Sequence, residues 1–127
     1  MSIENTILRH LIHDEDYARK VIPFLKEEYF QDRGDRLVFS EINKFMMEYN
    51  ALPTREALNI ELEKRSGIPE EEYASACNIV SELTQPDAVE KTWLLETTEH
   101  FCQEKAVYNA IMDSIRILDG KETAKDK

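Results

Sequence analysis

The stretch from Trp93 to Gly120 reads WLLETTEHFCQEKAVYNAIMDSIRILDG and predicts one long amphipathic helix. Apolar side chains recur along it at heptad spacing, at Leu94, Phe101, Tyr108 and Ile115. In the later turns this apolar stripe is widened by Ala110, Ile111, Met112 and Leu118. This stripe is wider than a strict coiled-coil seam, so we expect the first half of the helix to cover a globular core. The second half should reach beyond that core and meet a partner. The alternative is an ordinary helix that is buried throughout.

The acidic composition limits the classes of partner. The 127 residues carry a net charge of -10, with an acidic excess in every third of the chain, and this length is typical of one domain. Binding to DNA or RNA depends on clustered Lys and Arg that replace phosphate counterions. We therefore expect no direct binding to nucleic acid and predict contacts with other proteins instead.

Other features of the sequence concern its compartment and its cysteines. No apolar run approaches the roughly 18 to 20 residues of a membrane span, and residues 1–12 lack the apolar core of a signal peptide. These features predict a cytoplasmic protein. The polar segment from Lys121 to Lys127 is expected to be disordered and to begin a linker. Cys77 and Cys102 lie on apolar helix faces without CxxC spacing, so both should be reduced.

The first thirty residues predict two helices and a turn. Ser2 is a suitable N-cap for the first helix, and either Asp14 or Asp16 for the second. Pro23 should end or kink the second helix because proline lacks the amide hydrogen that the helix requires. The segment at 28–30, EYF, is expected to form a short aromatic turn.

Three more helices are expected before the long one. After a loop at 31–35, the most apolar helix should run from Arg36 to Tyr49 and form the centre of the core, and Asn50 with Pro53 should stop it. Thr54 can cap the next helix, and Pro69 suits the first turn of the one after it. The sequence therefore predicts an all-α fold, a compact bundle of about six helices that ends in the long helix.

No catalytic motif is evident. The glycines Gly34, Gly67 and Gly120 are far apart, which excludes a GxxxxGK[ST] phosphate loop and a GxGxxG turn. We predict no catalytic residue, no cofactor-binding residue and no bound cofactor in this chain. The acidic runs at 14–16 and 70–72 lie where helices begin, and capping and the helix dipole explain them without catalysis.

The order of the motifs carries a family resemblance. In sequence, these motifs are ILRHLIHD at 7–14, EYF at 28–30, RLVF at 36–39, PT at 53–54 and WL at 93–94. Together they resemble the N-terminal domain of DnaB-type hexameric replicative helicases. The chain is most similar to the primase-helicase branch carried by T-even-type tailed phages, over Ile3 to Leu118.

The resemblance implies a non-catalytic collar domain at 1–120. In the family this domain supports assembly of the helicase ring and docks primase or a loader within the primosome during DNA replication. The long helix would be the first arm of a helical hairpin. The second arm and a RecA-like ATPase domain, which uses ATP and Mg, would follow Lys127. The parent would then be an ATP-dependent DNA helicase in the host cytoplasm. Carried onto this chain, the family's dimer surface predicts these interface residues: Leu94, Phe101, Tyr108, Ile111, Met112, Ile115 and Leu118.

Two functions of other classes remain open at this point. The negative charge alone would also suit an acidic protein that imitates DNA and inhibits a DNA-binding enzyme. His10, His13 and Asp14 could hold a metal ion near one helix end, although they match no HExxH pattern and no metal is expected.

Overall fold

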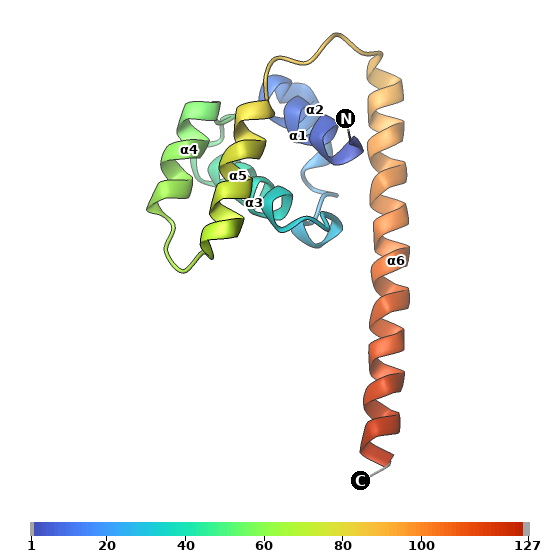
Figure 1. Cartoon of the computed structure of the whole chain (residues 1–127). Helices are drawn as coiled ribbons and strands as arrows, with labels where there is room; N and C mark the ends of the chain where they lie inside the picture. The colour runs from blue at the N-terminus through green and yellow to red at the C-terminus, as the bar shows by residue number, and fades with distance from the viewer. Residues whose placement is uncertain (1, 126–127) are drawn as a thin grey trace.

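The computed structural model describes residues 2–125, with side chains placed as far as Gly120, and its described part contains helices and no strand (Figure 1). The elements in chain order are α1 (Ile3–His13), α2 (Glu15–Val21), the 3-10 turn η1 (Glu27–Tyr29), α3 (Arg33–Tyr49), α4 (Arg55–Lys64), α5 (Glu70–Glu82) and α6 (Lys91–Lys125). Helices α1 to α5 and η1 form a body, and α6 stands along one side of it and extends well past it. The predicted all-α bundle of six helices is confirmed. No helix in the described range is long and apolar enough to cross a membrane.

The predicted caps start three of the helices. The side chains of Ser2, Asp14 and Thr54 each accept a hydrogen bond from the backbone N–H three residues further on, at 3.1, 3.1 and 3.0 Å. Each bond satisfies an N–H that has no partner within its own helix. Asp14, and not Asp16, is therefore the cap of α2. Pro23 lies just beyond the end of that helix, as predicted.

Helix α3 begins earlier than its apolar pattern suggests, so the predicted loop at 31–35 is wrong. Asp32 caps the helix through bonds from the N–H groups of Gly34 at 2.7 Å and Asp35 at 3.1 Å. Gly34 is buried against α5, where an added Cβ would overlap Ser75 Oγ and lie 2.8 Å from Ile79 Cδ1. This glycine therefore permits the close approach of two helices and does not mark a turn.

The far end of α3 follows its prediction. Asn50 adopts a left-handed conformation with φ of 52° and ends the helix. At the start of α5 the structure differs by one position, because Pro69 is the N-cap and Glu70 the first helical residue.

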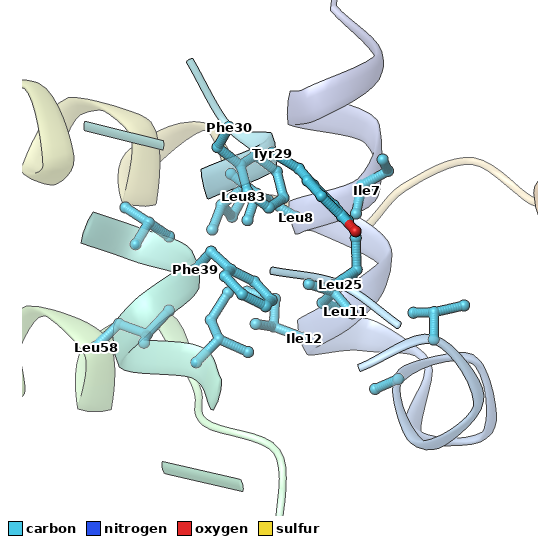
Figure 2. Close-up of a cluster of buried hydrophobic side chains, with 14 of the residues drawn as sticks. Ile7, Leu8, Leu11, Ile12, Leu25, Tyr29, Phe30, Phe39, Leu58 and Leu83 are labelled. Carbon is cyan, nitrogen blue, oxygen red and sulfur yellow. The ribbon is translucent and has the colours of Figure 1, made fainter. Parts of the chain in front are cut away.

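The core centres on aromatic rings that join distant segments. Phe39 of α3 is 2% exposed, and its ring stacks on that of Phe30 with centroids 5.1 Å apart. Figure 2 shows Phe39 in a cluster with labelled side chains from α1, from α4, from the segment around η1 and from Leu83 at the end of α5. The prediction that α3 forms the centre of the core is confirmed for Leu37, Val38, Phe39 and Ile42, whereas Tyr49 at its end is exposed.

Asp35 is in an unfavourable place for a charge. Partial burial, together with nearby Asp32, Glu4 and Glu82, raises the pKa of its carboxyl from 3.8 to about 6. Between these two values the folded chain holds more protons than the unfolded chain, so the free energy of unfolding falls as the pH rises. The ionised Asp35 therefore destabilises the fold at neutral pH.

Replacement of Phe39 by Ala should cost roughly 3 to 5 kcal/mol of the free energy of unfolding, because it empties a fully enclosed site. Thermal or urea denaturation followed by circular dichroism measures this cost. An unchanged melting temperature would exclude Phe39 from the core.

Replacement of Asp35 by Asn should raise the melting temperature at about pH 7.5, and the gain should shrink towards about pH 4, where Asp35 is protonated in the folded chain. Asp87→Asn in the exposed segment before α6 is the matched control. The interpretation fails if the two variants show the same dependence on pH.

Candidate assembly surface on helix α6

Helix α6 is longer than predicted at both ends. It runs from Lys91 to Lys125, 35 residues or about 52 Å, against the predicted Trp93 to Gly120. The Glu90 carboxylate caps its start by accepting bonds from the N–H groups of Thr92 at 3.1 Å and Trp93 at 2.7 Å, which lower the pKa of that carboxyl. Gly120 does not end the helix, because glycine costs an exposed helix only about 1 kcal/mol against alanine.

The first half of α6 is part of the core. Leu94 and Phe101 are 2% and 3% exposed, and Cys102 is buried beside them as a free thiol. The ring of Phe101 lies 5.6 Å from that of Phe30, which attaches α6 to the segment after η1. Burial raises the pKa of the Cys102 thiol, so it remains protonated and behaves as an apolar side chain.

A buried pair of hydroxyls fixes α6 against α2. Thr98 Oγ1 donates to the carbonyl of Leu94 at 2.8 Å and lies 2.6 Å from the Tyr17 hydroxyl. Since the single Thr98 hydrogen is used on Leu94, Tyr17 must be the donor in this second bond. Burial raises the pKa of Tyr17 further above its ordinary value, so the hydroxyl keeps its proton.

The attachment ends near the middle of the helix. Asn109 Nδ2 donates to the carbonyl of Glu28 at 3.1 Å, and among the described side chains this is the last hydrogen bond from α6 to the body. Sixteen residues separate Asn109 from the end of α6, so roughly 24 Å of helix extends beyond this bond. Figure 1 shows this half standing clear of the other helices.

The extended half carries an exposed apolar stripe. Tyr108, Ile111, Ile115 and Leu118, here called the distal seam, are 48%, 54%, 45% and 60% exposed. Their spacing of three, four and three residues places them on one side of the helix, as in the seam of a coiled coil. The distal seam therefore has the pattern of a surface that another helix can cover.

Two exposed residues near this seam were not predicted. Val107 lies four residues before Ile111, on the same side of the helix, and it could have been identified from that spacing. Ile117 is also exposed, but it lies about 100° round the helix from Leu118 and is outside the seam.

The seven predicted interface residues fall into two groups. Leu94 and Phe101 lie in the core of the chain itself and are unavailable to a partner. Met112 is half-buried, and the four residues of the distal seam are exposed. A contact role remains a prediction for these last five.

The structure does not bring the suggested metal ligands together. His10 Nδ1 lies 2.9 Å from the carbonyl of Thr6, whereas His13 Nε2 lies 2.8 Å from that of Leu83. Asp14 is occupied as the cap of α2. Within the described residues, no group of three His, Cys, Asp or Glu side chains could hold a metal ion.

Comparison with known proteins links the chain to one relative. No protein-family model matches it. A protein of Enterobacteria phage T4, named as a DnaB-like replicative helicase, is 34% identical over 121 residues. The match covers 95% of this chain and 25% of that protein, so the chain spans about a quarter of the relative's length. The resemblance predicted from the order of the motifs is confirmed.

Replacement of Thr98 by Val should lower the free energy of unfolding by about 1 to 3 kcal/mol, because the buried Tyr17 hydroxyl loses its acceptor. Thr97→Val is the matched control on the neighbouring, half-buried position. Chemical denaturation measures both variants. Equal stabilities would show that the hydroxyl pair does not hold α6 in place.

Proposed function

We propose that this chain, which is homologous to a segment of a DnaB-like replicative helicase, acts as the N-terminal assembly domain of such a helicase. In this role it helps neighbouring subunits associate into a hexameric ring and offers a docking surface for primase or a helicase loader. ATP hydrolysis, with its Mg ion, and strand unwinding are then tasks of the remaining part of the helicase. The sequence supports this division because it contains no phosphate loop.

The distal seam is the observation that carries the proposal. Four large apolar side chains lie about half exposed along the part of α6 that extends beyond the body. Exposed apolar surface at coiled-coil spacing is typical of a helix that pairs with another helix. We assign the seam to contacts between subunits, with Met112 and Val107 at its margins.

The size of the seam fits a contact that works within a larger assembly. Full burial of a large apolar side chain contributes about 1.5 to 3 kcal/mol, so the exposed halves of four side chains contribute on the order of 4 kcal/mol. Two such seams facing each other contribute on the order of 8 kcal/mol, which corresponds to a micromolar dissociation constant before the costs of association. A ring would therefore need further contacts from the rest of the helicase.

The charge of the chain supports contacts with proteins and not with DNA. Its net charge of -10 repels the phosphate backbone, and this disfavours a role in which the domain itself grips nucleic acid. We propose that any DNA passing through the ring is held by other domains.

Replacement of Ile111 and Ile115 together by Asp should weaken self-association of the chain, because the paired seams would bury unpaired carboxylates. Light scattering over a range of concentrations measures the effect. Ile117→Asp, equally exposed but outside the seam, is the matched control and should associate like the native chain.

Hydrogen exchange on the isolated chain and deletion of this domain from the intact helicase can each contradict the proposal. In a monomer, amides from Ile111 to Leu118 should exchange faster than those from Val38 to Tyr49, because the outer half of α6 lacks packing. Equal protection from exchange in the two segments would contradict the prediction that the outer half of α6 lacks packing. Normal ring assembly and primase capture by a helicase lacking residues 1–127 would exclude the proposed function.

A further inference from the structure

Three of the seven arginines line one hollow on this acidic chain. Arg33, Arg36 and Arg65 meet where η1, the start of α3 and the end of α4 come together, around a space of about 300 Å³. Glu27, Leu37, Ser40 and Glu72 complete the lining.

Arg65 forms an ion pair with a buried carboxylate. Its Nη1 donates to Glu41 Oε1 at 2.8 Å and to Ser40 Oγ at 3.5 Å. Glu41 is only 2% exposed, so this ion pair is shielded from water on the side of the carboxylate. The guanidinium of Arg65 is therefore fixed in one orientation at the edge of the hollow.

The other two arginines are each held by one bond. Arg33 Nη1 donates to Glu72 Oε1 at 3.0 Å, across to the first turn of α5. Arg36 Nε donates to the carbonyl of Phe30 at 2.9 Å, which fixes the plane of its guanidinium beside η1. No described residue accepts a hydrogen bond from Nη1 or Nη2 of Arg36.

Arg36 differs from its neighbours in the charge of the group that holds it. Arg33 and Arg65 each face a carboxylate, whereas Arg36 is held by a neutral carbonyl. A planar guanidinium that is already oriented, with both terminal nitrogens open, is suited to a two-bond contact with a carboxylate.

The acidic side chains around the hollow limit the kind of ligand that it can bind. Together with the Glu41 carboxylate that pairs with Arg65, Glu27 and Glu72 balance the charges of the three arginines, which disfavours a phosphate or another multiply charged anion. The charge of -10 on the whole chain also repels nucleic acid. A ligand with a single carboxylate suits the two open terminal nitrogens of Arg36. A hydrogen-bond donor next to that carboxylate suits Glu27 at the rim of the hollow.

We propose that this arginine hollow binds one Asp or Glu side chain of a partner protein, with Arg36 as the principal donor. The apolar floor at Leu37 and the hydroxyl of Ser40 accept the stem and the neighbouring backbone of that segment. The hollow lies on the body and uses no residue of the distal seam, so it is independent of the assembly role proposed for α6.

NMR titration of the 127-residue chain at about pH 6 tests this site through the arginine Nε–H signals. The probes are the peptide acetyl-Gly-Glu-Ser-Gly-amide, the same peptide with Gln in place of Glu, and inorganic phosphate. We expect the Glu peptide to shift the signals of Arg36 and its two neighbours with saturation, and the Gln peptide to cause no such shift.

The variants separate binding from folding. Arg36→Lys keeps the charge but removes the planar pair of donors. Arg33→Gln removes the charge of the most exposed arginine that lines the hollow. Each should bind the Glu peptide about ten-fold more weakly or worse, with circular dichroism confirming the fold. Arg116→Gln, on the outer half of α6, should bind like the native chain. Equal shifts with the Gln peptide, tighter saturation by phosphate, or native binding by Arg36→Lys would each overturn the proposal.

Discussion

The contact between three phenylalanine rings holds the parts of this molecule in one arrangement. Phe30, fully buried, lies 5.1 Å from Phe39 of α3 and 5.6 Å from Phe101 of α6. One residue after η1 thus joins the central helix of the body to the long helix beside it. The buried hydroxyl pair of Tyr17 and Thr98 adds a directional contact between α2 and α6 to this apolar packing.

The sequence predicted the helices well because their signals are local. Apolar spacing and caps such as Ser2, Thr54 and Asn50 depend on neighbours within a few residues, and the structure uses each of them as expected. Gly34 and Gly120 were misjudged for one common reason. A glycine has the same letter whether it turns the chain, admits a neighbouring helix or stays within a long helix, and only the tertiary surroundings separate these cases.

The two candidate surfaces differ in how far the sequence could reveal them. The distal seam lies on a single helix, so helical spacing was enough to place Tyr108, Ile111, Ile115 and Leu118 on one apolar stripe. The same spacing also included Leu94 and Phe101, because the pattern alone does not show where the body ends. The arginine hollow combines Arg33 and Arg36 with Arg65, from the far end of another helix. Their meeting depends on the packing of α3, α4 and α5, which no local pattern encodes.

The bond between Asn109 and the Glu28 carbonyl also makes the outer half of α6 a lever arm. A tilt of about 10° at this point would displace the end of the helix, roughly 24 Å away, by about 4 Å. That sideways displacement is nearly half of the 8 to 10 Å that separates the axes of two packed helices. Small changes in how α6 packs on α2 and η1 are thus amplified into sideways displacements of the distal seam. The alignment of any helix that pairs with the seam is consequently set by the body, at a distance from the contact itself.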